Sequence, residues 1–583
     1  MQTEPSTSAA YAQASFTNGY EFTQGKGYLL PEYPFVAPPE LASEKRLRHP
    51  IVIVGGGITG LTLACSLARL GIKAVLLDED NTVGVKGASS RGICYTQKSL
   101  EIFHKLGIYE RIAAKGVQWS VGRTFAGHDE VYSFDLKQQA NYNLSSQPPF
   151  INIQQFYIEG FLVERIVALG HVDLRWLSRV TAFEQNGEFG TLTVETPAGN
   201  YQIEADHVID ATGSRSPFYD WTGATLQTKK GDDRWCIADV RFTTRPPTER
   251  HTWIEAPFND NRAVWQHLMA DDVWRLDYQM APNADPDQVS REDVVRARLQ
   301  RQFGADTAVE IVWVGPYAYR SQCLDHLRAG RVFFMGDTAK IVSPFGARGG
   351  NTGVSDADNL AWKLAAVLRG HAAPKLLESY NHERLEAAQQ NVQVTNRTAR
   401  YLRPADGMER VFRSATIALA KQYPFARSLI NTGRMAVANA YTRTSACHAQ
   451  GGFSAQNVPL LFDTAGQHHG TLNDLLIWCE GRLLLLVFGR IPAMDLPRLC
   501  QLTTQFPVRV VQVLGANGKS FAQPKAVEHV FDPQDHLRQA TQAQGRRWAL
   551  LRPDSYVVGT GPGGPRWRSQ VTAMLTIALG GQP

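Results

Sequence analysis

Over most of the 583-residue chain, short apolar runs typical of strands alternate with segments whose apolar positions recur at helical spacing. The apolar run Ile51–Val54 predicts a buried strand, and apolar positions between Leu63 and Leu70 then recur at helical spacing. A second apolar run, Ala74–Leu77, predicts the next strand. Strand and helix patterns alternate to about residue 400, a helical stretch follows, and the alternation returns near Gly470. This order predicts an α/β fold.

Composition narrows the class of protein. A chain of 583 residues is too long for one hydrophobic core, so several domains are expected. Sixty basic and 55 acidic side chains give a formal charge of +5 without a long basic run, and we expect no nucleic-acid partner. Seven cysteines include no C-x-x-C pair, which predicts neither a zinc site nor a disulfide framework and fits the cytoplasm. The first 48 residues lack an apolar signal core, and no run of 18 apolar residues occurs, so neither export nor a membrane span is expected.

A glycine-rich turn, Gly55-Gly-Gly57-Ile-Thr-Gly60, lies between the first strand and its helix. At this spacing the first glycine lets the chain turn, the second lets the backbone approach a pyrophosphate, and the third lets the helix pack on the strand. The helix N-terminus then faces the phosphates. Asp78 ends the next strand, about twenty residues on, where a ribose-binding acid belongs. An ordinary turn is the alternative, but the register of strand, helix and acid favours dinucleotide binding.

A second glycine-rich segment follows the apolar run Val332–Met335. Gly336-Asp337 comes directly after that strand, and Gly349-Gly350-Asn351 opens a helix. An acid at a strand end beside a helix start brings a carboxylate and the positive end of a helix dipole together. Such a pair can hold a sugar-like hydroxyl and an anionic ring edge. The alternative is a structural turn with a solvated aspartate.

Over roughly residues 49–400, these segments resemble the single-component FAD-dependent aromatic hydroxylases, which include the phenol and hydroxybenzoate hydroxylases. The resemblance implies that Asp78 binds the adenosine ribose and Asp337 the ribityl chain. It also implies that the helix after Asn351 points at the flavin pyrimidine, where reduced flavin carries negative charge. Arg91 looks like the family arginine that reaches the FAD phosphates, and Gln155 looks like the glutamine beside the flavin side chain.

Two positions depart from the family pattern. Thr212, in Asp210-Ala-Thr212-Gly213, stands where the family usually has an aspartate that helps seat FAD and NAD(P)H, and Lys340 replaces a common histidine. The glycine framework is otherwise intact, so the expected cofactors are FAD with NADPH or NADH as electron donor. The candidate cofactor-binding residues are Gly55, Gly57, Ile58, Thr59, Gly60, Asp78, Glu79, Arg91, Gln155, Thr212, Gly213, Asp337, Pro344, Gly349, Gly350 and Asn351.

The resemblance also implies a reaction. NAD(P)H would reduce FAD, O2 would form a flavin C4a-hydroperoxide, and its distal oxygen would pass to a phenolic or related small aromatic substrate. A buried pocket is expected, because water would otherwise divert the oxygen to hydrogen peroxide. The resemblance places the carbonyl of Pro344 beside the reacting ring.

Further catalytic candidates lie on strand-like segments within residues 217–319. In Trp274–Gln279 the alternation puts Arg275 on one face and Tyr278 on the other. Tyr278 or His267 is the candidate for moving the substrate proton. An aromatic residue in such a sheet is otherwise packing, and Arg275 is otherwise paired with Asp277. Whether the substrate carries an acidic group stays open; the candidates for contacting it are His251, His267 and Arg275.

The predicted architecture is a Rossmann-like FAD-binding domain, 49–216 and 320–400, interleaved with a β-sheet substrate domain, 217–319. An N-terminal tail and arm, 1–48, precedes it, and we expect the arm Tyr28–Phe35 to pack on the main body. A helical linker, 401–450, leads to a C-terminal α/β domain, 451–583, which resembles the thioredoxin-like domain of many such hydroxylases. Without a C-x-x-C pair it cannot exchange dithiols, so packing and homodimer formation are its expected uses.

Other functions share parts of these patterns. A flavin-binding redox sensor or degenerate homologue would keep the FAD motifs without turnover, and Thr212 is the residue that favours this alternative. A flavin-dependent halogenase would share the first glycine turn, but the chain has no Trp-x-Trp-x-Ile-Pro segment. A reductase or an oxidase is a further alternative, which oxygen uptake coupled to ring hydroxylation would separate.

Overall fold

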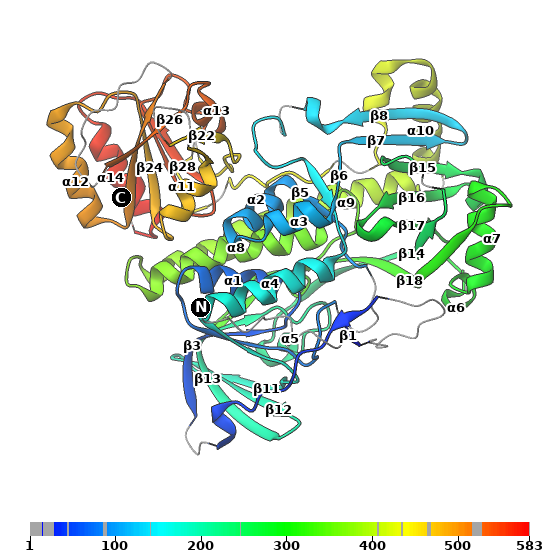
Figure 1. Ribbon diagram of the computed structural model, residues 1–583, viewed down its shortest axis with the longest axis horizontal. Coiled ribbons are helices and arrows are strands. Elements are labelled where there is room, and N and C mark those ends of the chain that lie inside the picture. Colours follow the sequence, from blue (N-terminus) through cyan, green and yellow to red (C-terminus); the bar gives the residue numbers. More distant parts are fainter. Residues whose placement is uncertain are drawn as a thin grey trace, which may run out of the picture.

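The structure is a computed structural model that describes residues 14–15, 28–42, 46–84, 90–139, 142–244, 246–404, 407–432, 435–442, 444–449, 451–462, 468–515 and 527–581. Figure 1 shows a central body built on two large sheets and a C-terminal domain beside it. Within the described residues, no helix is long and apolar enough to cross a membrane.

The first sheet runs in the order β10-β4-β3-β13-β12-β11, and β20 pairs with β13 and with β19. Strands β10, β4, β3, β13 and β20 are parallel to one another, as an α/β nucleotide-binding domain requires, whereas β12, β11 and β19 pair antiparallel. The strands are β3 (Leu47–Val54), β4 (Ala74–Leu77), β10 (Val172–Arg175), β11 (Arg179–Gln185), β12 (Gly190–Thr196), β13 (Gly199–Asp210), β19 (Arg328–Ala329) and β20 (Val332–Phe334).

Four helices cover this domain: α1 (Ile58–Arg69), α2 (Gln97–Leu106), α4 (Gln155–Leu169) and α8 (Gly349–Leu368). Helix α1 packs against both α4 and α8. The first turn of α1 carries Thr59, which lies between two glycines. A Cβ on Gly336 would come 2.5 Å from the Thr59 Oγ1, and one on Gly353 would come 2.1 Å from the same atom. These glycines therefore let the two glycine-rich segments predicted from sequence meet at one place.

The second sheet runs β21-β18-β14-β17-β16-β15-β7-β8. Its strands are β7 (Val121–Ala126), β8 (Asp129–Asp135), β14 (Leu226–Phe242), β15 (Arg250–Ala256), β16 (Arg262–Leu268), β17 (Val273–Gln279), β18 (Val309–Leu324) and β21 (Lys340–Ile341). Helix α7 (Glu292–Phe303) covers one face. The predicted borders of the substrate domain, at 216/217 and 319/320, do not match the borders of this sheet. The hairpin β7–β8 joins this sheet through parallel pairing with β15, and β18 runs past residue 320.

The N-terminal arm packs on the main body, as predicted. Tyr28, Leu30 and Tyr33 are buried, and the Tyr33 ring stacks on Trp176 with centroids 4.5 Å apart. The Tyr28 hydroxyl donates to Asp239 of β14 at 2.8 Å. Most of the predicted tail before this arm lies outside the described residues. The arm thus links the two sheets of the central body.

The region after residue 400 is only partly the helical linker that we predicted. Helix α9 (Glu378–Leu402) crosses the predicted border, and α10 (Met408–Gln422) and the 3-10 helix Pro424–Leu429 follow. The described residues between 430 and 449 form no helix. Their backbone instead bonds other segments, as where the Tyr441 N–H donates to Gly452 O at 2.7 Å. Local helical propensity gives way here to contacts that only the folded chain provides.

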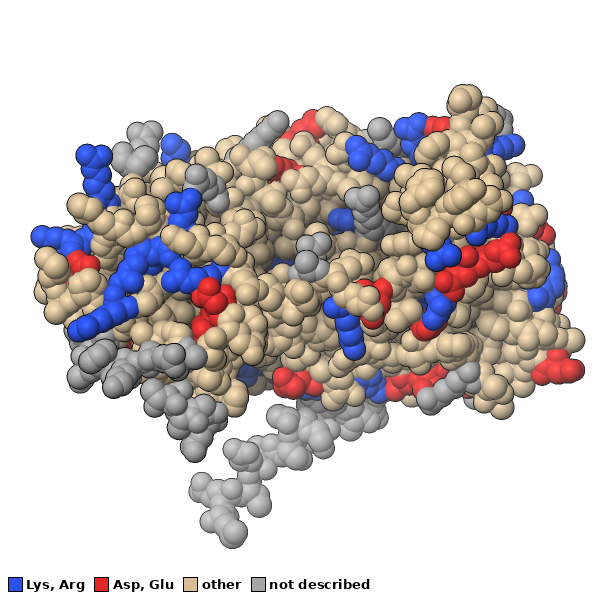
Figure 2. Space-filling view, turned by 90° about the horizontal axis from the view of Figure 1, so that it is seen from above, with Lys and Arg blue, Asp and Glu red and all other residues tan. Residues whose placement is uncertain are grey.

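The C-terminal domain has a seven-stranded sheet in the order β23-β22-β26-β25-β24-β27-β28. Strands β24, β25 and β26 are parallel, and β27 and β28 are antiparallel. The elements are β22 (Pro459–Leu461), β23 (His469–Thr471), α11 (Leu472–Trp478), β24 (Leu483–Phe488), α12 (Leu496–Gln505), β25 (Val508–Leu514), β26 (Val527–Phe531), α13 (His536–Ala540), β27 (Trp548–Leu551), β28 (Val557–Gly561) and α14 (Trp567–Ala578). The thioredoxin-like identity of this domain stays a prediction. Figure 2 shows Lys and Arg prevailing over its end of the molecule, with both signs mixed elsewhere.

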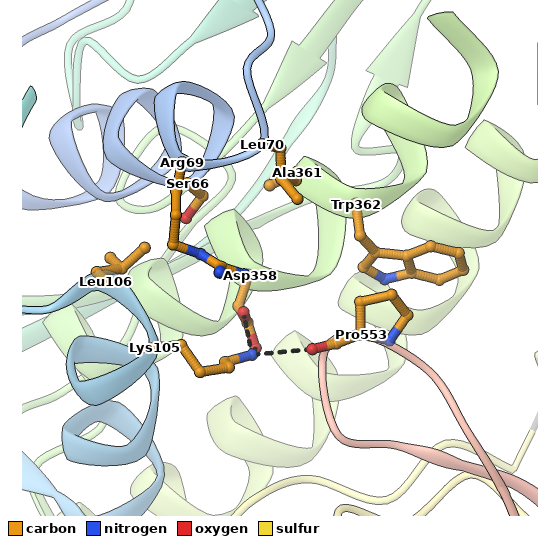
Figure 3. Close-up of a pocket in the computed structure, with 9 residues that line it drawn as sticks. All are labelled: Ser66, Arg69, Leu70, Lys105, Leu106, Asp358, Ala361, Trp362 and Pro553. Carbon is orange, nitrogen blue, oxygen red and sulfur yellow. Dashed lines mark hydrogen bonds and ion pairs between the residues drawn. The ribbon is translucent and has the colours of Figure 1, made fainter. Parts of the chain in front are cut away.

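Buried ion pairs join the C-terminal domain to the central body. Arg552 forms ion pairs with Glu383 at 2.6 Å and with Asp554, and Glu383 also pairs with Lys363 at 2.8 Å. Figure 3 shows a pocket at this junction, where Lys105 contacts Asp358. It is lined by Ser66, Arg69, Leu70, Lys105, Leu106, Asp358, Ala361, Trp362 and Pro553. Because it lies at the C-terminal end of α1, this pocket is separate from the glycine turn at the other end.

Candidate active site

The first glycine turn has the backbone conformation and the open space that a pyrophosphate needs. Gly55 has φ +110°, and a Cβ there would lie 2.4 Å from Ala211 O. A Cβ on Gly60 would lie 2.0 Å from Gly55 O, so the helix packs tightly on the turn. At Gly57, by contrast, a Cβ would meet no atom within 4 Å. The Ile58 N–H bonds the buried Glu159 carboxylate, and no side chain of the N-cap Gly57 caps the helix, so the N–H groups of Thr59 and Gly60 are left for an anion.

Asp78 lies beside this turn. The Gly56 N–H donates to its Oδ2 at 2.5 Å, and the Asp80 N–H donates to its Oδ1 at 2.8 Å. Burial outweighs these bonds and raises the pKa of the Asp78 carboxyl to about 7. Asp78 stays the candidate for binding a ribose hydroxyl. Glu79 points elsewhere: its side chain is 58% exposed and lies 3.7 Å from Arg179.

Three side chains hold the loop of Ser90, Arg91 and Gly92. Gln155 Oε1 accepts from Gly92 N at 3.2 Å, and the guanidinium of Arg275 donates to Arg91 O. Ser90 Oγ donates to Asp239 Oδ1 at 3.2 Å. Arg91 itself is exposed and has φ +49°, so the loop holds an unusual backbone conformation. Residues 85–89, which precede this loop, lie outside the described residues.

Thr212 satisfies a buried carboxylate. Its Oγ1 donates to Asp210 Oδ1 at 2.7 Å and its N–H donates to the same oxygen at 3.1 Å. Ser216 Oγ donates to the other oxygen at 2.5 Å. Burial still raises the pKa of Asp210 to about 6. Gly213 N donates to Thr338 Oγ1 at 2.8 Å, which ties this turn to the one that carries Asp337.

A buried group of ion pairs and hydrogen bonds holds the turn that carries Asp337. Asp337 is exposed at the turn, while Lys340 is buried and pairs with Asp356. Asp356 also accepts from Gly336 N at 3.0 Å and pairs with Arg384 at 2.6 Å. Lys340, which stands at the family's histidine position, therefore helps hold the backbone of the turn rather than facing a ligand.

Helix α8 begins at Gly349, as the sequence predicted. A Cβ on Gly349 or on Gly350 would meet no atom within 4 Å, and no side chain caps this helix. The Asn351 amide accepts from Thr96 N at 3.0 Å and donates to Cys94 O at 2.8 Å, so it positions the helix start. Pro344 is half-buried in the preceding loop, and its carbonyl accepts from Ala347 N at 3.1 Å.

One face of the second sheet lies against this loop. We call the face that carries Arg250, His267, Arg275 and Asp277 the inner face. The Trp265 ring contacts Phe345, the residue after Pro344, with centroids 5.0 Å apart. Cys94 Sγ lies 3.9 Å from His267 Nδ1. The inner face therefore contacts the loop that leads to α8 and the segment that carries Cys94.

The predicted catalytic side chains of the sheet lie on two opposite faces. His267 and Arg275 are neighbours across β16 and β17, and burial with nearby Arg250 and Arg275 lowers the pKa of His267 well below its usual value. Arg275 pairs with Asp277 at 2.8 Å. Tyr278 lies on the opposite face, where its hydroxyl donates to Gln302 of α7 at 2.8 Å. The prediction of Tyr278 as a proton-transfer residue was therefore wrong, because its side chain faces away from the inner face.

Two buried residues at this site were missed from sequence. Tyr28 reaches Asp239 from the N-terminal arm, and Arg250 opens β15 next to His267. Neither lies in a motif, and their positions depend on contacts between segments far apart in the chain. The arm's aromatic residues gave a signal for packing but none for a polar contact.

The comparisons with known proteins agree with this geometry. Residues 48–395 match the family described as FAD binding domain. The chain is 27% identical over 540 residues to 6-methylpretetramide 4-monooxygenase of Streptomyces rimosus, covering 88% of this chain and 90% of that protein. It is 24% identical over 431 residues to 3-(3-hydroxy-phenyl)propionate/3-hydroxycinnamic acid hydroxylase of Mycolicibacterium smegmatis, covering 73% and 75%. The crystal structure of the flavin-dependent monooxygenase PieE with FAD and substrate shares the fold, with TM-score 0.73, 22% identity, and 91% and 98% coverage. This chain belongs to the FAD binding domain family and is an FAD-dependent monooxygenase.

Proposed function

We propose that this enzyme hydroxylates a phenolic or related aromatic ring, with FAD as cofactor, NADH or NADPH as electron donor and O2 as oxygen source. The observation that carries the proposal is the pair of uncapped helix starts, at α1 and at α8, with open space at Gly57 and at Gly349. Each has an acid beside it, Asp78 or Asp337. The name of the mycobacterial relative, a hydroxylase of a hydroxyphenyl acid, supports an aromatic substrate.

The residues present fit FAD. The N–H groups of Thr59 and Gly60 would bind the pyrophosphate, while the Ile58 N–H already bonds Glu159. Asp78 would accept from the adenosine ribose and Asp337 from the ribityl chain. Exposed Arg91 would reach the phosphates. Gln155 would act indirectly, since its oxygen already holds the loop at Gly92.

The remaining site residues would orient the ring and keep water out. When bound, FAD supplies hydride acceptance from NAD(P)H and the activation of O2. The N-terminus of α8 would stabilise negative charge at the flavin pyrimidine through backbone N–H groups, since the Asn351 amide is already engaged. The buried inner face excludes water from the reacting ring. Arg250 and Arg275 would favour an ionised ring hydroxyl, whereas burial and the same two cations lower the pKa of His267 and make it a poor group to hold the proton.

The experiment is NAD(P)H oxidation and O2 uptake by the FAD-loaded protein against phenols, aminophenols, hydroxybenzoates and polycyclic phenols. We expect one or more rings to stimulate both, with a product heavier by one oxygen. Labelled oxygen from O2 in that product would distinguish hydroxylation from uncoupled oxidation. Bound FAD without NAD(P)H turnover on any ring would favour the alternative of a redox sensor or degenerate homologue.

We also propose a homodimer, formed through α10 rather than through the C-terminal domain. The exposed side of α10 carries Met408, Val411 and Phe412, which are 80%, 60% and 58% exposed. Large apolar side chains gathered on one helix face mark an interaction surface. Light scattering checks this proposal. We expect the wild type to be a dimer and Phe412→Glu to be a monomer, and a monomeric wild type would contradict it.

A further inference from the structure

Arg250 is a buried cation without an acidic partner. Only 7% of the residue is exposed. Its Nη1 donates to Met435 Sδ at 3.0 Å, its Nε has no partner, and no carboxylate of the described residues forms an ion pair with it. A thioether is a weak acceptor, so the guanidinium is far from satisfied. Burying a charge without a paired anion is costly, which makes such a residue unusual.

Other buried arginines in this protein are compensated. Arg384 pairs with Asp356, Arg552 with Glu383, and Arg175 with Glu40 at 3.0 Å. Arg298, which is as buried as Arg250, donates to Val289 O at 2.9 Å and lies over the Tyr278 ring. The fold therefore routinely supplies partners to buried guanidinium groups. Arg348, which is equally buried, donates to the neutral Asn391 Oδ1 at 2.7 Å. Arg250 differs from Arg298 and Arg348 because its acceptor is a thioether sulfur rather than an oxygen.

The position of Arg250 points toward the reacting centre. It shares the inner face with His267, because the register that pairs His251 with Gln266 puts Arg250 opposite His267. Its contact, Met435, precedes Ala436, whose N–H donates to Gly346 O at 2.9 Å in the loop before α8. The guanidinium thus lies between the sheet and the loop that leads to the expected flavin site.

The neighbouring charges are already engaged. Asp277 pairs with Arg275, and Asp239 accepts from Tyr28 and Ser90. His251, a sequence candidate for contacting an acidic substrate, lies 3.1 Å from Glu249 instead. Asp277 is near enough to act on the charge of Arg250, but its ion pair is with Arg275.

We propose that Arg250 binds a negatively charged oxygen group of the aromatic substrate, either a carboxylate or an ionised hydroxyl. A guanidinium presents several N–H donors in a planar fork that matches two oxygens, and the bonds are stronger when the acceptor is charged. The substrate anion would supply the missing partner, and Met435 would give up a weak contact. This inference rests on the proposed function, since it places an aromatic substrate on the inner face.

The test compares binding of matched probes to the FAD-loaded protein: one-, two- and three-ring phenol carboxylates, each with its neutral amide. Binding is read from the perturbation of flavin absorbance, so it does not require turnover. We expect the wild type to prefer the anion. Arg250→Met should weaken anion binding by about 30-fold or more and leave the amide within about 3-fold, with partial recovery in Arg250→Lys.

Arg298→Met is the matched control, because it removes an equally buried guanidinium from the opposite face of the sheet. It should keep the preference for the anion and lower Tm, since Val289 O loses its donor. Arg250→Met should keep or raise Tm, because it removes an uncompensated buried charge. A large fall in Tm for Arg250→Met, with no change in anion preference, would instead assign Arg250 a structural role.

The outcomes separate this proposal from the proposed function. If the amide binds more tightly as rising pH ionises its ring hydroxyl, and Arg250→Met loses this increase, the ionised hydroxyl is the anion that Arg250 binds. A preference for carboxylates identifies the carboxylate. A wild type that responds to neither anion, an Arg250→Met variant that keeps the wild-type response, or an absence of binding by every probe overturns the role of Arg250 even if some other ring is hydroxylated. An anion preference that depends on Arg250 supports it even if no oxygen is inserted.

Discussion

Replacing Gly57 by alanine tests whether the open space at the first turn belongs to a ligand. Gly57 has φ −76° and ψ 178°, a conformation that alanine adopts without strain, and its Cβ would meet no protein atom within 4 Å. The apo-protein should therefore fold, and it should gain about 0.4–1 kcal/mol because alanine restricts the unfolded chain.

The same methyl group would stand where the pyrophosphate approaches the backbone. Extra atoms in a closely packed site cost about 1–3 kcal/mol, which corresponds to about 5–150-fold weaker FAD binding. Gly60→Ala is the informative contrast, because its Cβ would lie 2.0 Å from Gly55 O. That clash is with backbone, so Gly60→Ala should destabilise the apo-protein as well as lose FAD.

The assay is titration of both apo-variants with FAD, followed by flavin fluorescence, together with thermal unfolding of the same samples. We expect Gly57→Ala to separate the two readouts and Gly60→Ala to lower both. Wild-type FAD affinity in Gly57→Ala would refute the pyrophosphate assignment of this turn. A large loss of apo stability in the same variant would refute the claim that the space is open.

Three further predictions follow from the site. Asp337→Ala should lose FAD during purification while apo Tm is unchanged, since this carboxylate is exposed; a variant that stays fully yellow would remove its role. Lys340→Met should cost about 1.5–3 kcal/mol in urea unfolding, because it removes one charged hydrogen bond to Asp356 while the ion pair of Asp356 with Arg384 remains; a loss below about 1 kcal/mol would contradict the anchoring role. Burial raises the pKa of Asp78 from 3.8 to about 7, so the folded apo-protein holds this proton more tightly and the group's contribution to stability falls as pH rises between these values. FAD affinity should conversely rise across about pH 7, where the carboxylate ionises, and Asp78→Asn should flatten that rise in titrations at several pH values; an unchanged profile would exclude Asp78.

Much of the nucleotide-binding part of the fold was predictable because its requirements are local. The starts of α1 and α8 and the end of β4 were each marked by glycines or an acid directly beside an apolar run. Gly55 has a positive φ, and the position of Gly60 leaves no room for a Cβ, so glycine at these two positions predicts the local backbone geometry. The substrate sheet was less predictable, since β7 and β8 join it through long-range pairing with β15.

The amino-acid sequence by itself determined the cofactor class, because a dinucleotide site is built from backbone turns and helix starts that short motifs specify. Only the tertiary structure decided which side chains face the substrate. In the folded chain Tyr278 contacts α7, Asp277 forms its ion pair with Arg275, and the Arg250 side chain donates to a thioether. Residue type states which bonds a side chain can make, whereas strand register and the packing of distant segments decide which partners remain for it.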